Sequence, residues 1–187
     1  MFQGDLPGSW RRQGALQVCL AQPPTATDEQ IDRGQPRPAA VAIAEQLLQA
    51  PSPASRSRVH QASSGAPVLI AFPEYSLSVE DVISIDESIS GTSLPVLFFA
   101  GFGTAEGTQL GELISKHGFT PAWSGGADSL LPEGRYGCGA VWAHVEPGTT
   151  SRWICLKNFH EQTHEAILPS LCAGEETLRL DGDEIGR

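Results

Sequence analysis

Two positions in this sequence carry side chains that could take part in catalysis or bind a metal. One is Glu74, which stands just beyond the apolar run Pro67–Phe72. The other is the pair His160 and His164, with Glu161 beside the first histidine. Functional groups of α/β proteins gather where buried strands end, and a carboxylate in such a position can serve as a general base. An exposed glutamate without a catalytic part is the alternative interpretation of Glu74 taken alone.

The histidine segment 160–164 matches the H-E-x-x-H signature of zinc proteases. On a helix, the two histidines would lie on one face, and Glu161 could activate a metal-bound water. The charged Glu165 departs from the uncharged residues that such helices favour after the second histidine. Ile167 and Ser170 stand where the extended zinc pattern has Gly and a third His. Two surface histidines in a loop are the simpler interpretation, and a zinc-dependent hydrolase is kept as an alternative.

The apolar patterns along the chain predict the strands and helices that would position these residues. Apolar runs without alternation are typical of strands covered on both faces, and apolar residues on one helical face predict a helix over Ala39–Gln49. Ser78 followed by Asp81 indicates a second helix, which runs to about Ile89. The expected strands are Ala15–Gln22, Pro67–Phe72, Leu94–Phe99, Gly139–Val145 and Trp153–Leu156. Pro147-Gly148 would join the last two as a hairpin, and the order of elements predicts an α/β layered fold.

The glycine-rich segment Gly101–Gly107 follows one of these strands. Its spacing, G-x-G-x-x-x-G, is one residue longer than the glycine fingerprint of dinucleotide-binding folds, and no clear helix opens there. We therefore predict a glycine-rich turn at this place and no nucleotide cofactor. Pro73 is expected to end its strand, because proline cannot donate a backbone hydrogen bond.

The segment Val68–Ser76 resembles the glutamate motif of the nitrilase superfamily, the carbon–nitrogen hydrolases, in which a hydrophobic strand ends in Phe-Pro-Glu. Three further segments resemble strands of that family and come in the same order: Leu16–Gln22, Leu94–Gly101 and Arg135–Val145. In the last of them the family usually has Asn, where this chain has Gly137 or Cys138. The resemblance covers about residues 15–187. It implies an α-β-β-α sandwich, incomplete because only the N-terminal part of the domain is present, preceded by a flexible segment 1–14.

The resemblance also implies roles for individual residues. Trp153–Lys157 resembles the family's lysine motif, which implies that the Lys157 ammonium stabilises the oxyanion formed when a nucleophile adds to a carbonyl or nitrile. Glu74 would take the proton of the nucleophile, and Glu165 stands where many members carry a second glutamate. The implied reaction is hydrolysis of a non-peptide carbon–nitrogen bond in a small-molecule amide, nitrile or carbamoyl substrate, without a metal or organic cofactor. Homo-oligomers are a further expectation, because family members commonly form them.

The nucleophile of the family is a cysteine thiolate in a later segment. The four cysteines of this chain lie in other segments: Cys19, Cys138, Cys155 and Cys172. We predict that they are buried free thiols rather than nucleophiles. The end of the chain, Leu180–Arg187, resembles the stretch that leads into the cysteine strand. The 187 residues alone are therefore expected to be inactive, and a non-catalytic binding module is a further alternative.

Net charge, the length of the apolar stretches and the cysteine spacing indicate which partners the protein could bind and in which compartment it lies. The chain has 12 basic and 22 acidic residues and a formal charge of −10, which disfavours nucleic acid because phosphate backbones are repelled. No apolar stretch approaches the length of a membrane span, and the first residues lack the apolar core of a signal peptide. No cysteines are spaced as C-x-x-C, and free thiols suit a reducing compartment. The sequence therefore predicts a cytoplasmic protein that binds neither nucleic acid nor membrane.

Overall fold

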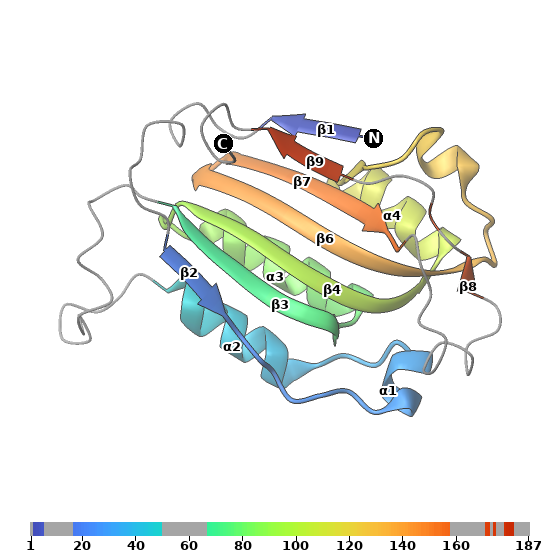
Figure 1. Cartoon of the computed structure of the whole chain (residues 1–187), viewed down its shortest axis with the longest axis horizontal. Coiled ribbons are helices and arrows are strands. Elements are labelled where there is room, and N and C mark those ends of the chain that lie inside the picture. The colour runs from blue at the N-terminus through green and yellow to red at the C-terminus, as the bar shows by residue number, and fades with distance from the viewer. Residues whose placement is uncertain are drawn as a thin grey trace.

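The computed structural model describes residues 2–5, 17–49, 67–157, 171–172, 174 and 178–181. Within them the chain has a mixed α/β fold built on one large sheet, which confirms the predicted class (Figure 1). The helices are α1 Asp28–Asp32, α2 Pro38–Leu48, α3 Val79–Gly91 and α4 Gly107–His117, with a 3₁₀ turn, η3, at Gly126–Ser129. The strands are β1 Phe2–Asp5, β2 Gln17–Leu20, β3 Val68–Leu77, β4 Val96–Glu106, β5 Thr120–Pro121, β6 Arg135–Glu146, β7 Thr149–Leu156, β8 Leu171–Cys172 and β9 Leu178–Asp181.

The large sheet has seven strands in the order β2-β3-β4-β6-β7-β5, with β8 paired to β6 off this path. β2, β3 and β4 run parallel to one another. β6 is antiparallel to β4, and β7 is antiparallel to β6. The predicted hairpin between β6 and β7 is confirmed, and its turn contains Gly148 with a φ of 87°. β1 and β9 form a separate parallel pair, so the segment expected to be flexible, residues 1–14, contains a strand.

The two predicted helices form where their local signals place them. The Ser78 hydroxyl accepts a hydrogen bond from the Asp81 backbone N–H at 3.2 Å, and the Asp81 carboxylate accepts one from the Ser78 N–H at 2.8 Å. This reciprocal capping satisfies backbone donors that a helix start leaves without partners. α2 begins with Pro38, whose fixed φ suits the first turn of a helix.

The turn predicted at Gly101–Gly107 is wrong, because β4 continues to Glu106 and α4 begins at Gly107. The strand continues because Phe102 and Ala105 are buried and pair with β6 across an irregularity of register. Glycine is needed here because other parts of the backbone pass close by: a Cβ on Gly107 would lie 2.1 Å from the Leu131 carbonyl oxygen. β3 extends to Leu77, so the strand does not end at Pro73. Its pairing with β4 is nevertheless interrupted after Phe72 and resumes at Leu77, as expected of a residue that cannot donate a backbone hydrogen bond.

The two faces of the sheet carry different clusters of apolar side chains. The larger cluster joins β3, β4, β6 and β7 to α2, α3 and α4, and Figure 1 shows these three helices on the same side of the sheet. At its centre Trp142 is fully buried, in edge-to-face contact with Phe98 and Phe119 at centroid distances of 5.6 and 5.7 Å. The smaller cluster, on the opposite face, is formed by Leu97, Val141, Ala143 and Trp153. We call these the helix-covered face and the opposite face.

On the helix-covered face, a group of hydrogen-bonded polar side chains connects α3 to the hairpin of β6 and β7. We call it the Asp86 cluster, and it consists of Asp86, Ser90, Trp142 and Arg152. The Asp86 carboxylate accepts hydrogen bonds from Trp142 Nε1 at 3.0 Å and from Arg152 Nε. Arg152 also donates from Nη2 to the Ser90 hydroxyl at 2.8 Å. A buried charge is tolerated only when it is paired and hydrogen-bonded, so the Asp86 cluster fixes the position of α3 against β6 and β7.

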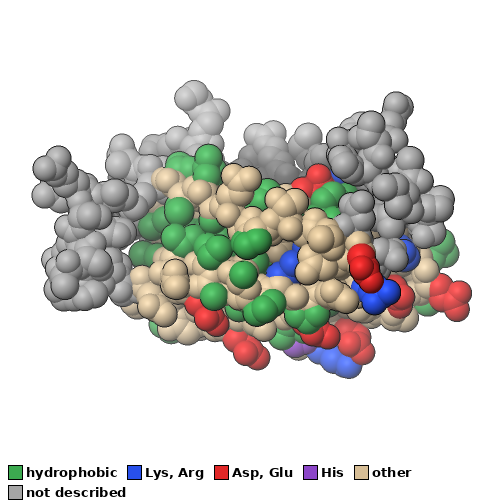
Figure 2. All heavy atoms as spheres, turned by 90° about the horizontal axis from the view of Figure 1, so that it is seen from below, with side chains coloured by type: hydrophobic (Ala, Val, Ile, Leu, Met, Phe, Trp, Pro, Cys, Tyr) green, Lys and Arg blue, Asp and Glu red, His purple; other side chains and the backbone are tan. Residues whose placement is uncertain are grey.

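The surface of the described part is apolar in a few places. The exposed large hydrophobic side chains there are Val18 and Leu20 of β2, and Leu131. Figure 2 views the molecule from the side on which β2 and α2 lie, and hydrophobic side chains gather in the middle of that side. No helix among the described residues is both long enough and apolar enough to cross a bilayer.

Candidate active site

Glu74 and Lys157 meet in an ion pair, with 2.7 Å between Glu74 Oε1 and Lys157 Nζ. The Lys157 side chain is 21% exposed and that of Glu74 is 49% exposed, so the amine is covered while the acid stays open to solvent. β3 and β7 are separated in the sheet by β4 and β6, but the backbone at Glu74 already lies against β4, because a Cβ on Gly101 would collide with the Glu74 Cα. The Lys157 side chain runs over Gly137 of β6, with its Cδ 3.5 Å from where a Cβ would stand, and its amine reaches the Glu74 carboxylate there.

Three glycines, which we call the glycine floor, leave those intervening strands bare. They are Gly101 on β4, and Gly137 and Gly139 on β6, and Gly101 and Gly139 are direct partners in the ladder. A Cβ on Gly101 would lie 2.6 Å from the Glu74 Cα, and one on Gly137 would lie 3.4 Å from the Lys157 Cβ. The Lys157 backbone N–H donates to the Gly137 carbonyl at 2.8 Å. A side chain at Gly101 would collide with the Glu74 backbone, whereas a Cβ on Gly137 would meet the Lys157 side chain at ordinary van der Waals distance.

The glycine floor lies on the opposite face of the sheet. Side chains alternate between the two faces along a strand. Phe98, Ala100 and Phe102 of β4 belong to the helix-covered cluster. Leu97 and Phe99 contribute to the smaller cluster, and Gly101 continues their alternation. The Glu74–Lys157 pair therefore lies on the side of the sheet that α2, α3 and α4 do not cover.

Tyr75 completes the group around the amine. Lys157 Nζ donates to the Tyr75 hydroxyl at 3.4 Å and lies 5.4 Å from the centroid of its ring. Tyr75 has a φ of 58°, the left-handed region that favours glycine, and it is the one described residue other than glycine with a positive φ. Such a conformation costs about 1–2 kcal/mol for a residue with a Cβ. The strained backbone turns two successive side chains, Glu74 and Tyr75, toward Lys157.

Two side chains hold the backbone of this strained segment. The Ser76 hydroxyl lies 2.7 Å from the Pro73 carbonyl and 3.1 Å from the Gly101 carbonyl, within hydrogen-bond distance of both. The Arg37 guanidinium donates from Nη1 to the Tyr75 carbonyl at 2.9 Å. The position of the Glu74 carboxylate is therefore set from β4 through Gly101 and from the start of α2 through Arg37.

The structure brings together two of the residues singled out in the sequence, Glu74 and Lys157. Glu165 lies outside the described residues, and so does the zinc-type segment 160–164. Within the described part, no group of three His, Cys, Asp or Glu side chains could hold a metal ion. No sequence pattern indicated Arg37 or the Tyr75 conformation, because neither a long-range contact nor a positive φ of tyrosine has a local signature.

Two of the described cysteines, Cys138 and Cys155, are poor candidates for a nucleophile. Burial raises the pKa of the Cys138 thiol well above its usual value, with a smaller contribution from Cys155. Burial also raises the pKa of Cys155, to about 11. A thiol attacks as its thiolate, so both are unreactive near neutral pH. The prediction of buried free thiols is confirmed for Cys138, whereas Cys19 and Cys155 are half-buried.

Alkylation of the folded chain should follow this order of thiol acidity. At pH 8, a thiol with a pKa of about 11 is ionised in roughly one molecule in a thousand. We expect iodoacetamide to modify Cys155 slowly, with a rate that rises about tenfold for each pH unit up to pH 10. Peptide mass spectrometry over time measures the rate, and the chain unfolded in guanidinium is the reference. Modification of Cys155 at the same rate in folded and unfolded chains at pH 8 would contradict this assignment.

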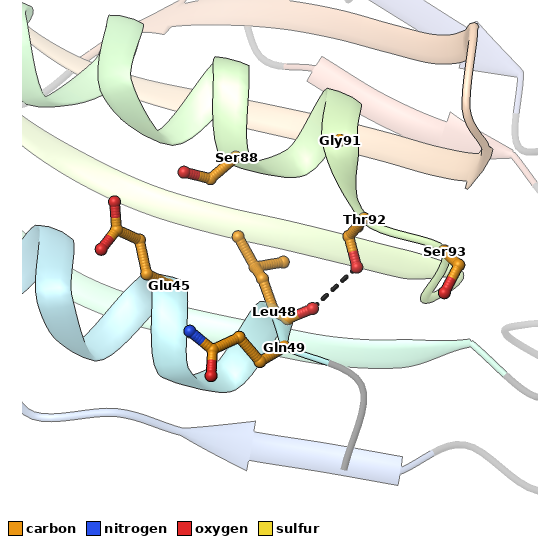
Figure 3. Close-up of a pocket in the computed structure, with 7 residues that line it drawn as sticks. All are labelled: Glu45, Leu48, Gln49, Ser88, Gly91, Thr92 and Ser93. Carbon is orange, nitrogen blue, oxygen red and sulfur yellow. Dashed lines mark hydrogen bonds between the residues drawn. The ribbon is translucent and has the colours of Figure 1, made fainter. Parts of the chain in front are cut away.

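A hollow of about 420 Å³ lies elsewhere, between α2 and α3 (Figure 3). It is lined by Glu45, Leu48, Gln49, Ser88, Gly91, Thr92 and Ser93. The Thr92 hydroxyl donates to the Leu48 carbonyl across it at 2.7 Å. Thr92 precedes the start of β4 at Val96, which pairs with Val68 at the start of β3, while Glu74 follows Phe72 at the other end. The hollow is thus remote from Glu74 and Lys157 and has one charged side chain.

Comparison of the chain with protein-family models, with curated proteins and with solved structures gave no significant match. The function must therefore be inferred from the site itself, together with the motifs of the sequence.

Proposed function

We propose that the chain carries the acid–base part of a hydrolase for non-peptide carbon–nitrogen bonds, of the kind found in the nitrilase superfamily. The observation that carries the proposal is the 2.7 Å contact between Glu74 Oε1 and Lys157 Nζ across two intervening strands. These are two of the three residues to which the resemblance gives catalytic roles, and the third, Glu165, lies outside the described residues. An ion pair joining two such positions at one end of the sheet is the arrangement that those roles require.

The fold agrees with this proposal at the level of its layers. In an α-β-β-α sandwich, one sheet is covered by helices on its outer face and by a second sheet on its inner face. Here α2, α3 and α4 pack on the helix-covered face, and they would form one outer layer. The glycine floor and Glu74–Lys157 lie on the opposite face, which would become the inner one.

The chemistry follows from the charges of the pair. The proton of a cysteine thiol passes to Glu74 as the sulfur attacks the carbonyl or nitrile carbon of the substrate. For an amide, the resulting oxyanion is stabilised by the Lys157 ammonium, whose effect is strengthened because the amine is covered from water. Glu74 then returns the proton to the departing nitrogen. Water, deprotonated by Glu74, hydrolyses the thioester and regenerates the thiol. By the same resemblance, that cysteine is none of the four in these 187 residues.

The proposal is tested with the whole gene product and a panel of small amides, nitriles and carbamoyl compounds. We expect ammonia release from at least one of these classes and loss of the activity after thiol alkylation. The 187-residue chain alone is the matched control, and it should release no ammonia. A folded gene product that releases no ammonia from any class, or whose activity survives complete alkylation of its thiols, would overturn the proposal.

A further inference from the structure

We infer that Arg37 is a positioning residue for the Glu74–Lys157 pair: its buried guanidinium holds the strained Tyr75 backbone that turns Glu74 toward the amine. The inference builds on the proposed function only in its consequence for catalysis. The geometry that it concerns can be measured without turnover, so the two can fail separately.

The contacts of Arg37 are divided between its backbone and its side chain. Its backbone N–H donates to both oxygens of the Asp81 carboxylate, at 3.0 and 2.8 Å, which joins the start of α2 to the start of α3. Its side chain donates from Nη1 to the Tyr75 carbonyl at 2.9 Å and from Nε to the Gln35 carbonyl at 3.3 Å. A substitution of the side chain therefore removes the contact with Tyr75 while leaving the two bonds to Asp81 in place.

The burial of Arg37 is costly, and packing alone does not explain it. The residue is 7% exposed, and its Nη2 has no hydrogen-bond partner among the described residues. Burial lowers the pKa of the guanidinium, and the nearby Asp81 carboxylate acts in the opposite direction. An apolar side chain would fill the same space without an unsatisfied donor. What it would lack is a charged donor for the Tyr75 carbonyl.

The Tyr75 carbonyl, which accepts the hydrogen bond from Arg37, belongs to the residue with the strained backbone. Tyr75 has a φ of 58°, and it directly follows Glu74. If Tyr75 relaxed to an ordinary extended conformation, its side chain and the preceding carboxylate would turn away from the route across the glycine floor. A hydrogen bond from a charged donor is strong enough to offset the strain of one left-handed residue. Arg37 and the Tyr75 strain are therefore expected to be energetically coupled.

The lysine content of the chain gives a direct readout. Its two lysines are Lys116 and Lys157, so a protein labelled with ¹⁵N at the lysine ζ position gives two ammonium signals by NMR. A Lys116→Arg variant assigns them. The measured quantity is the Glu74-dependent shift, the displacement of the Lys157 signal caused by Glu74→Gln in each background. Lys116, which pairs with Glu112 at 2.8 Å, is the internal reference.

Arg37→Met is expected to lower the population of the turned conformation about tenfold relative to the relaxed one and to abolish most of the Glu74-dependent shift. Arg37→Lys keeps a cationic donor and should retain part of it. The double variant Arg37→Met with Tyr75→Gly should recover the shift, because glycine adopts a positive φ without strain. The Lys116 signal should stay in place throughout.

Two results would overturn the inference. One is a full Glu74-dependent shift in Arg37→Met. The other is that Arg37→Met reduces the Glu74-dependent shift equally in the original background and in the Tyr75→Gly background. That result would mean that Arg37 acts through general packing. If Arg37→Met does not fold, Arg37→Lys makes the same comparison in the same two backgrounds. The experiment involves no hydrolysis, so a failed assay for ammonia release leaves its outcome intact.

Discussion

Replacing Glu74 with glutamine in the whole gene product is expected to lower kcat for amide hydrolysis about a thousandfold, with the fold intact. Glutamine has the same size and can still accept a hydrogen bond from Lys157, but it cannot take a proton. The stability of the protein should change little. The Glu74 side chain is 49% exposed, so solvent screens its pairing with the covered Lys157 amine, and the pair contributes about 1 kcal/mol or less. Initial rates of ammonia release and unfolding in urea measure the two quantities.

The chain offers a matched control for this experiment. Glu112 and Lys116 form a second ion pair at 2.8 Å on the surface of α4, with side chains more than half exposed. Glu112→Gln removes the same charge and should leave kcat unchanged. Lys157→Met should lower kcat as Glu74→Gln does, since it removes the cation to which the proposed mechanism assigns the oxyanion. Activity of Glu74→Gln within a few-fold of the unaltered protein would show that Glu74 is not the general base.

The largest loss of stability is expected from Asp86→Ala, which should lower the free energy of unfolding by about 3–5 kcal/mol. The substitution leaves Arg152 as a partly buried cation without its carboxylate, and it leaves the Trp142 indole N–H without an acceptor. Either change is costly in a site with little access to water. Denaturant unfolding followed by tryptophan fluorescence measures the loss.

Glu87 provides the comparison, because it is the next residue on α3 and its side chain is exposed. Glu87→Ala should change the free energy of unfolding by no more than about 0.5 kcal/mol. Asp86→Asn keeps an acceptor for Trp142 but loses the charge, so it should fall between the two. Equal effects of Asp86→Ala and Glu87→Ala would mean that the Asp86 cluster adds nothing to stability.

Local signals predicted the parts of the fold that carry them. α3 was predicted from Ser78 and Asp81, since capping is decided within one turn of chain. α4 was missed because its sequence is rich in polar residues and has glycine at two positions, Gly107 and Gly111. It packs on the core chiefly through Leu110 and Leu113. Tertiary contacts, rather than propensity, therefore decide that this segment is helical.

The candidate site divides in the same way. The acid and the amine could be located because each follows an apolar run, and such runs are recognisable in a sequence. The features that bring Glu74 and Lys157 together involve residues far apart in the sequence. They are the absence of side chains at Gly101 and Gly137, and the hydrogen bond from Arg37 to the Tyr75 carbonyl. Such features depend on which strands become neighbours, and a periodic pattern of apolar residues does not specify that.

The Asp86 cluster and the glycine floor lie on opposite faces of the same sheet. The Asp86 cluster thus holds α3 to the hairpin on one face, while the proposed catalytic groups, Glu74 and Lys157, lie on the other. For protein engineering, this separation means that substitutions around Glu74 and Lys157 leave the contacts between α3 and the hairpin in place.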